Sequence, residues 1–281
     1  SMRVRRTPRD RAQVHGLRVQ GGRVILLLFF LGTHEVSWLG RTDVPLFVSH
    51  RRLARQASWP RALGPWALDS GGFSELSLFG AWRTPATEYA AAVARYIERI
   101  GGMAWAAIQD WMCEPFMVER TGLSIAEHQR RTIDSFLELR DLAPGIPWAP
   151  VIQGFGRADY HGHVRQYTAA GVDLGAAPIV GVGSICRRQG TDEAARILGS
   201  LSALGLRLHA FGLKTLGLRK IRDEVVSADS MAWSLNARKN PPLPECRHKS
   251  CANCLRYALR WRDNVLSTAA APMWRQAELF S

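Results

Sequence analysis

Short apolar runs recur along the chain at regular intervals. Each run is four to eight residues long, which is typical of buried β-strands. The runs are Val24–Leu31, Val44–Ser49, Trp66–Asp69, Trp105–Gln109, Trp148–Gln153, Ala177–Gly183, Leu206–Phe211 and Glu224–Asp229. The pattern therefore predicts eight strands.

Helix signals lie between several of these runs. Pro85 stands at a first helical position with Gly101 as a stop, and Ser124 with Glu127 forms a capping box that starts another helix. The predicted helices cover residues 84–100, 124–142, 157–170, 191–204 and 215–221, and a last one near the end of the chain covers 253–265.

Strands that alternate with helices predict a (β/α)8 TIM barrel, although a doubly wound open sheet has the same alternation. Polar residues favour the barrel. The carboxyl ends of barrel strands form one rim, so groups at these ends meet at one pocket, whereas an open sheet spreads them along an edge. The strand-end groups are Thr33-His34, Ser49-His50, Asp69-Ser70, Gln109-Asp110, Gln153, Gly183-Ser184, Gly212 to Lys214 and Asp229-Ser230.

The region after the last predicted strand differs in character. The segment NPPLP (240–244) is a stiff spacer, and Cys246, His248, Cys251 and Cys254 then stand within nine residues. Three thiols and one imidazole suit tetrahedral Zn2+, and four protein ligands leave no open position, so we expect a structural zinc site and not three free thiols beside a surface histidine. The expected organisation is a basic arm (1–23), a barrel domain (24–240) and a zinc-binding appendage packed on the barrel (241–281).

Composition narrows the functional classes. Of 281 residues 47% are hydrophobic, and the longest apolar run has eight residues, so we expect neither disorder nor a membrane span. The chain has 37 Lys and Arg against 24 Asp and Glu. The net charge of +13 favours a polyanionic partner, nucleic acid first and an acidic membrane surface second, or else reflects an arginine-rich solvated surface. The five cysteines do not form a disulfide framework, which favours a reducing cytoplasm. Arginines and lysines flank the Cys/His cluster and predict a positive face there: Arg247, Lys249, Arg256, Arg260 and Arg262.

Three carboxylates, Asp69, Asp110 and Asp229, each end a short apolar strand. A carboxylate in apolar surroundings is costly unless it is hydrogen-bonded, so the set indicates a function. Two carboxylates at a rim can carry out a double displacement at a sugar carbon, in which one attacks C1′ and the other transfers protons. The alternative is that each aspartate only caps the next helix.

Other strand ends carry groups suited to a planar ligand. The motif DSGGF (69–73) has paired glycines that allow a tight turn, and its Phe73 offers a ring for stacking. Gln153 has an amide that both donates and accepts, and VGVGS (180–184) offers backbone N–H groups. Phe211, in HAFGLK, stands where it can stack on the other face of the ligand. Taken singly, a phenylalanine such as Phe73 or Phe211 is more often a core residue.

This ordered set of motifs resembles the tRNA-guanine transglycosylases over roughly residues 24–260, and DSGGF with the C-terminal Cys/His cluster is the specific part. The resemblance implies a TIM barrel with a zinc site and an enzyme that exchanges guanine in nucleic acid for a 7-deazaguanine without cutting the strand. It implies that Asp229 is the nucleophile that forms a covalent glycosyl intermediate and that Asp69 is the general acid/base. The residues that it implies for base binding are Asp110 and Gln153 at the base edge, Gly183 as a backbone donor to the base carbonyl, and Phe73 and Phe211 on the two faces.

The chain departs from the family pattern in two places. His248 takes the second place of a cluster that the family builds as C-x-C-x2-C with a distant histidine. VGVGS replaces the usual paired-glycine segment, so Gly181 could stand in for Gly183.

The compact chain is more similar to the DNA-modifying branch of these enzymes, found in bacterial modification clusters and phages, which inserts 7-cyano-7-deazaguanine (preQ0) or a relative into DNA. We therefore expect DNA and a 7-deazaguanine base as partners. The alternatives are the same exchange on tRNA and a non-catalytic, zinc-containing nucleic-acid-binding protein. The sequence leaves the oligomeric state open.

Overall fold

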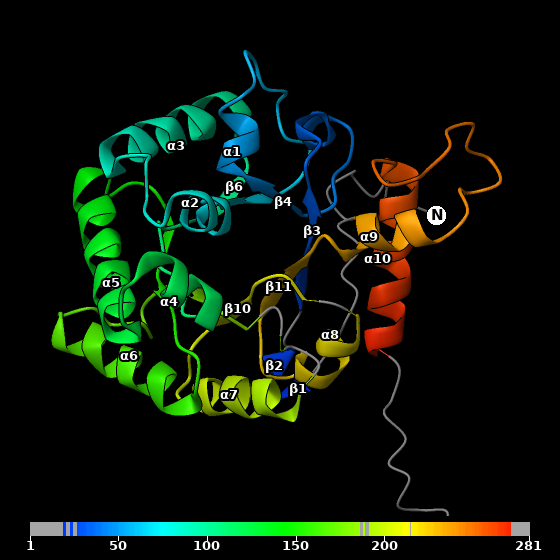
Figure 1. The fold of residues 1–281 in the computed structure, drawn as a ribbon. Coiled ribbons are helices and arrows are strands. Elements are labelled where there is room, and N and C mark those ends of the chain that lie inside the picture. The colour runs from blue at the N-terminus through cyan, green and yellow to red at the C-terminus, as the bar shows by residue number, and fades with distance from the viewer. Residues whose placement is uncertain are drawn as a thin grey trace, which may run out of the picture.

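The computed structural model describes residues 19–20, 23–24, 27–185, 188, 191–213 and 215–270. Its centre is a nine-stranded parallel sheet in the order β7-β6-β5-β4-β3-β11-β10-β9-β8 (Figure 1). The strands are β3 (Leu28–Thr33), β4 (Leu46–Ser49), β5 (Trp66–Asp69), β6 (Met103–Ala107), β7 (Trp148–Ala149), β8 (Val151–Ile152), β9 (Val180–Val182), β10 (Leu208–Ala210) and β11 (Ser227–Ser230).

The sheet closes because its two edge strands belong to one stretch of chain. Only Pro150 separates β7 from β8; β7 pairs with β6, and β8 pairs with β9. Proline has no N–H to donate to a ladder, which explains the break. Residues 148–152 thus act as one strand that completes an eight-stranded barrel, and the predicted barrel is confirmed over the open sheet.

Helices surround the strands, as the ring in Figure 1 shows. Three short helices follow β4, β5 and β6. α1 (His50–Leu53) begins directly after β4, α2 (Gly72–Phe79) begins after a tight turn that follows β5, and α4 (Pro115–Thr121) begins after the loop 108–114 that follows β6; α2 and α4 lie inside the ring. The helices are α1 (His50–Leu53), α2 (Gly72–Phe79), α3 (Ala86–Ile100), α4 (Pro115–Thr121), α5 (Ile125–Leu142), α6 (Arg157–Ala169), α7 (Asp192–Ser202), α8 (Thr215–Ile221), α9 (Ala232–Lys239) and α10 (Leu255–Ala270), with a 3-10 turn at Val36–Gly40. All six predicted helices are present, and α10 runs beyond its predicted end because no glycine or proline stands between Val265 and Ala270.

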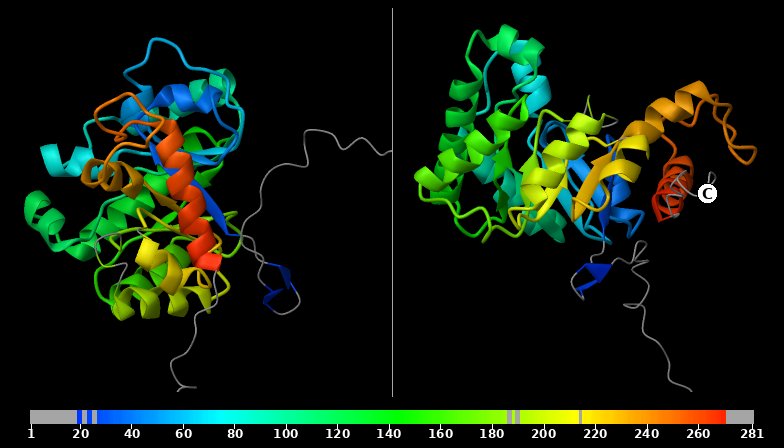
Figure 2. Two further views of the ribbon diagram at one scale, coloured as in Figure 1. Left: turned by 90° about the vertical axis from the view of Figure 1, so that its right-hand side faces the viewer. Right: turned by 90° about the horizontal axis from the view of Figure 1, so that it is seen from below.

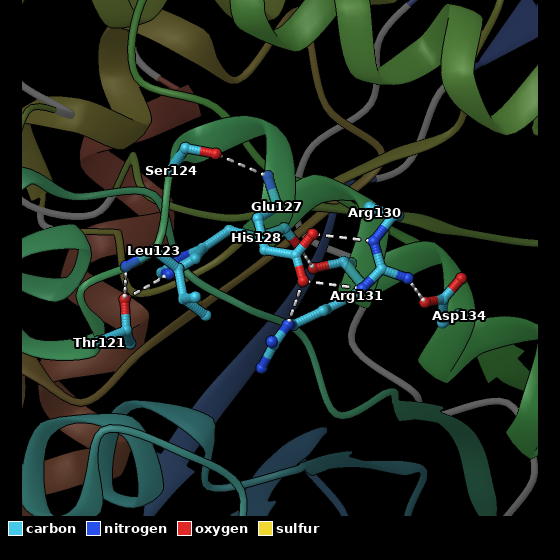
Figure 3. Close-up of polar contacts among 9 residues, drawn as sticks. Thr121, Leu123, Ser124, Glu127, His128, Arg130, Arg131 and Asp134 are labelled. Atoms are coloured by element: carbon cyan, nitrogen blue, oxygen red, sulfur yellow. Dashed lines mark hydrogen bonds and ion pairs between the residues drawn. The ribbon is translucent and has the colours of Figure 1, made fainter.

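The start of α5 shows how the sequence sets a helix boundary (Figure 3). Ser124 Oγ accepts the N–H of Glu127 at 3.2 Å, as the capping box predicts. Hydrogen bonds from Arg130 and Arg131 lower the pKa of Glu127 to about 2. The Arg131 guanidinium also lies 4.7 Å from the centre of the Trp111 ring, which ties α5 to the loop after β6.

The first predicted strand begins later than expected. Val24 pairs with Val19 in a separate antiparallel ladder, formed by β1 (Val19–Gln20) and β2 (Arg23–Val24), and the barrel strand begins at Leu28. The apolar run crosses this boundary, so hydrophobicity does not mark it. Most of the predicted basic arm, together with Cys186 and Lys214, lies outside the described residues.

Apolar side chains fill both sides of the barrel wall. Along β3, Phe30 belongs to a small buried cluster, whereas Phe29 and Leu31 belong to the larger cluster that includes residues of the surrounding helices. Alternate residues of a strand point to opposite faces, so β3 supplies both layers. The small cluster consists of Phe30, Ala67, Trp105, Ala107, Ala149 and Ile179.

The C-terminal helix α10 lies along the outer side of the barrel, next to α9 (Figure 2). Arg262 is buried and donates from Nε and Nη2 to the carbonyl oxygen of Phe29, at 3.3 and 3.2 Å. Arg262 therefore does not belong to the positive face that the sequence predicted. It fixes the appendage to the first barrel strand.

Candidate active site

A cavity of about 310 Å³ lies at the carboxyl ends of the barrel strands. Pockets of roughly 300–1,000 Å³ are typical of small-molecule sites. All seven residues predicted for catalysis and base binding line the cavity: Asp69, Phe73, Asp110, Gln153, Gly183, Phe211 and Asp229.

Most other strand-end groups also reach the cavity, including Thr33, His34 and Ser49. Three polar side chains among the described residues do not. The buried ring of His50 contacts the Tyr96 hydroxyl at 3.1 Å, Gln109 Nε2 donates to the carbonyl oxygen of Thr84 at 2.7 Å, and Ser230 Oγ accepts the N–H of Ala232 at 3.2 Å. The barrel rim therefore gathers these groups as predicted, except for side chains that the surrounding helices use.

Asp229 lies in β11 and is held by two donors. Its Oδ1 accepts the N–H of Gly212 at 2.8 Å and lies 3.3 Å from Nε2 of His209. Nδ1 of His209 lies 2.8 Å from the hydroxyl of Ser227. If that hydroxyl donates to Nδ1, Nε2 carries the proton and donates to Asp229. In this tautomer the carboxylate of Asp229 accepts hydrogen bonds from both Gly212 and His209.

Asp69 ends β5 in a different environment. Burial raises its pKa, and the negative charge of Asp229 acts in the same direction. Hydrogen bonds from Ser49 and from the backbone of Gly71 oppose the rise. A carboxyl group with a raised pKa can gain and lose a proton closer to neutral pH, as a general acid/base must. The two aspartates thus lie in one cavity with contrasting surroundings.

The glycines of DSGGF make the turn that follows Asp69. Gly71 has φ of 84°, in the left-handed region. A Cβ on Gly72 would lie 2.9 Å from both Met112 Cε and Trp82 Cζ2. The predicted tight turn is present, and the close approach at the second glycine is to protein side chains.

Asp110 and Gln153 meet at one end of the cavity. Gln153 Nε2 donates to Asp110 Oδ2 at 2.5 Å, and Gln153 Oε1 lies 2.7 Å from Ser184 Oγ. Ser184 Oγ also lies 2.8 Å from Glu114 Oε2 and accepts the N–H of Cys113 at 2.7 Å. Burial, with the charges of Asp69 and Glu114, raises the pKa of Asp110 to about 7.

The glycines of VGVGS make room for two site residues. A Cβ on Gly181 would lie 2.6 Å from the Phe211 ring, and one on Gly183 would lie 2.1 Å from Gln153 Nε2. The N–H of Gly183 donates to the carbonyl oxygen of Ile152 at 3.0 Å. This N–H is engaged in the barrel, so it is not available to a base carbonyl, and the role that the resemblance implied for it does not hold in this structure.

Aromatic rings border the cavity and continue beneath it. Phe73 is 44% exposed on α2, whereas Phe211 is partly buried and its ring centre lies 4.7 Å from that of His209. Trp105 in turn lies 4.6 Å from His209, between ring centres. His209 is therefore packed among rings on one side and bonded to Asp229 on the other.

The Cys/His cluster forms a separate candidate metal site between α9 and α10. One ligand atom from each of the four residues lies within 4.8 Å of the others. The Sγ atoms of Cys246 and Cys254 are 3.8 Å apart, close to the separation of two thiolates that bind one Zn2+ at about 2.3 Å in a tetrahedral site. The N–H of Leu243 lies 3.4 Å from Cys251 Sγ, a contact typical of a thiolate ligand. The residues therefore fit a metal ion.

The arrangement of these groups in a barrel can be compared with known families. The model of the family DpdA, deoxypurine in DNA protein A, matches residues 26–280. The chain belongs to the DpdA family. DpdA proteins are DNA 7-deazaguanine transglycosylases related to the tRNA-guanine transglycosylases, so this chain is a guanine transglycosylase that acts on nucleic acid. Among curated proteins no significant match is found.

The DpdA match covers both the barrel and the Cys/His appendage. In the part of the chain that the structure describes, no helix has the length and apolar character needed to cross a bilayer.

The sequence did not indicate two members of the site. Glu114 precedes the proline that starts α4, and its contact with Ser184 joins residues 70 positions apart. His209 belongs to the motif that was singled out for Phe211, but no spacing shows that it faces Asp229. A buried polar residue within an apolar strand was the available signal for His209.

Proposed function

We propose that this DpdA protein exchanges guanine in DNA for a 7-deazaguanine such as preQ0 by a retaining double displacement. The observation that carries the proposal is the pair Asp69 and Asp229 in one cavity, one with a raised pKa and the other held by two donors.

In the first step Asp229 attacks C1′ of the target deoxyguanosine. Because Oδ1 is held by Gly212 and His209, we assign the attack to Oδ2. The bond from C1′ to the base breaks, and Asp69 delivers a proton to the departing guanine. In the second step Asp69 takes a proton from the incoming base, whose nitrogen attacks C1′ and releases Asp229. Two inversions at C1′ retain the configuration.

The remaining cavity residues hold the base. Phe73 and Phe211 stack on its two faces, while Asp110 and Gln153 hydrogen-bond its edge. Since the Gly183 amide is engaged, we assign the contact with the base carbonyl to the N–H of Ser184, the next residue in the chain. A guanosine in duplex DNA has to be flipped out, at a cost of a few kcal/mol, and stacking recovers part of that cost.

The metal of the Cys/His cluster is, in this proposal, a structural Zn2+. It holds the segment that joins α9 to α10. Exposed Arg247 and Lys249 on this segment, together with exposed Arg256 and Arg260 on α10, bind DNA phosphates. Metal analysis of the purified chain should find one zinc ion per chain.

The test of the exchange uses labelled guanine with duplex DNA or tRNA. We expect label in DNA, a covalent protein–DNA adduct on denaturing gels, and loss of both in Asp229→Asn. Asp141→Asn, an exposed position at the end of α5, is the matched control. Label only in tRNA would refute the DNA substrate, undiminished exchange by Asp229→Asn would refute the nucleophile, and DNA binding without any exchange would favour a non-catalytic protein.

A further inference from the structure

Two carboxyl groups at one end of the cavity are joined by a chain of buried side chains. Asp110 contacts Gln153, Gln153 contacts Ser184, and Ser184 contacts Glu114, at 2.5, 2.7 and 2.8 Å. The four side chains belong to residues that are 0% to 8% exposed. Polar groups buried to this extent have to satisfy one another.

The number of available protons limits how these four side chains can be hydrogen-bonded to one another. Ser184 has one hydroxyl proton, and its oxygen already accepts the N–H of Cys113, so it donates to Gln153 or to Glu114 but not to both. If it donates to Gln153 Oε1, its contact with Glu114 is a hydrogen bond only when Glu114 is protonated. If the Gln153 amide is turned over, its NH2 donates to Ser184 and its oxygen faces Asp110, which must then be protonated. In both arrangements the two carboxyl groups hold one proton between them.

We propose that Asp110 and Glu114 share one proton through Gln153 and Ser184, and that Glu114 is a positioning residue that sets the orientation of the Gln153 amide. The consequence for base recognition rests on the function proposed above. With the proton on Glu114, every bond of the chain points toward an ionised Asp110. With the proton on Asp110, every bond is reversed.

The two arrangements present different hydrogen-bond donors and acceptors to a base. Guanine carries an amino donor beside its carbonyl acceptor, and 7-deazaguanines keep this pyrimidine edge. These bases favour an ionised Asp110 as acceptor and hence the proton on Glu114. Glu114 thereby selects, through two intervening side chains, bases that present donors to Asp110.

The backbone supports this arrangement. Ser184 has φ of 55° and is the one residue other than glycine with positive φ among those that the structure describes. This conformation is unfavourable for an L-residue, and such strain is concentrated at functional sites. The absence of a Cβ on Gly183 lets the Gln153 amide lie against the backbone.

Other charged and titratable groups surround the hydrogen-bonded row of four side chains, and within this row only the carboxyl groups of Asp110 and Glu114 can carry the proton. Asp69 and Asp229 line the same cavity, from β5 and β11. Behind it, burial raises the pKa of the Cys113 thiol and of the Tyr160 phenol, so both stay neutral at physiological pH. Arg188 lies against Phe155, and its charge opposes the rise at Tyr160.

Infrared spectroscopy of the full chain without base or DNA tests the shared proton. In Glu114→Gln the new amide donates to Ser184 without a carboxyl proton, so Asp110 stays ionised. We expect the band of protonated carboxyl groups at neutral pH to weaken in Glu114→Gln and to persist in Glu119→Gln, an exposed glutamate on α4, the helix that begins directly after Glu114. An equal band in wild type and Glu114→Gln would overturn the proposal.

Exchange kinetics test the positioning role. In the wild type, KM for the base should rise once pH is high enough to remove the shared proton. Glu114→Gln has no shared proton to lose, so this rise should be absent from the variant, with a much smaller change in kcat, and Glu119→Gln should follow the wild type. Superimposed profiles of wild type and Glu114→Gln would refute the role. A wild-type chain that exchanges no base refutes the proposed function instead, and the infrared result still decides the shared proton.

Discussion

Replacing Asp110 with asparagine should stabilise the protein at neutral and alkaline pH. Burial raises the pKa of Asp110 from 3.8 to about 7. Between these values the folded state holds a proton that the unfolded chain has released, so stability falls as pH rises through this window. A shift of about three units corresponds to about 4 kcal/mol, because one unit is about 1.4 kcal/mol. Asparagine keeps the acceptor for Gln153 without the charge.

The gain should therefore depend on pH. Asp110→Asn and the wild type should have similar melting temperatures near pH 4. At pH values above 7 the melting temperature of the variant should be several degrees higher than that of the wild type, since about 2 °C per kcal/mol is expected for a chain of this size. Thermal unfolding between pH 4 and 8, followed by circular dichroism, measures this difference. Asp141→Asn, which removes an exposed carboxylate, should show no pH-dependent gain. A difference for Asp110→Asn that does not grow with pH would refute the reasoning.

Three further predictions concern the groups around the cavity and the metal. Gly181→Ala should lower kcat/KM by an order of magnitude or more, because its Cβ would displace the Phe211 ring. Gly145→Ala is the control and should be neutral, because no atom lies near its new methyl group. Equal kcat/KM values for Gly181→Ala and the wild type would contradict the stacking role of Phe211. His209→Leu should lower kcat strongly and change KM little. His209→Gln should recover part of the lost kcat, since glutamine can still donate to Asp229. Equal kcat values in the two variants would contradict the donor role of His209. A chelator or Cys251→Ser should lower the melting temperature and release one metal ion per chain, measured by calorimetry and mass spectrometry; unchanged melting would contradict a structural metal.

The fold was predictable because each barrel strand is a short apolar run with a polar group at its carboxyl end. The start of β3 was not, since the apolar run VILLLFFL continues across the boundary at Leu28. The division of one strand into β7 and β8 had a visible cause in Pro150.

The site was predictable to the level of which residues share a cavity. The rim brings strand ends together whatever their sequence separation, so Asp69 and Asp229 meet without any local signal. Contacts between individual side chains could not be predicted from the sequence, because they depend on side-chain rotamers and backbone angles. Glu114 contacts Ser184, whose positive φ no local pattern indicates, and Gly183 lost its implied role because the barrel ladder uses its N–H.

The division of residues 148–152 into β7 and β8 also makes the barrel wall easier to open there than between β3 and β11. β7 and β8 each hold their neighbour through two residue pairs, whereas β11 holds β3 through four. Amide hydrogens in the β7–β6 and β8–β9 ladders should exchange with solvent before those in the β3–β11 ladder, because fewer ladder bonds must break for the former to open. Gln153 directly follows β8, so opening of the β8–β9 ladder disrupts the base-binding end of the cavity first. On heating, the protein should lose its discrimination between bases at a temperature at which most of the barrel is still folded.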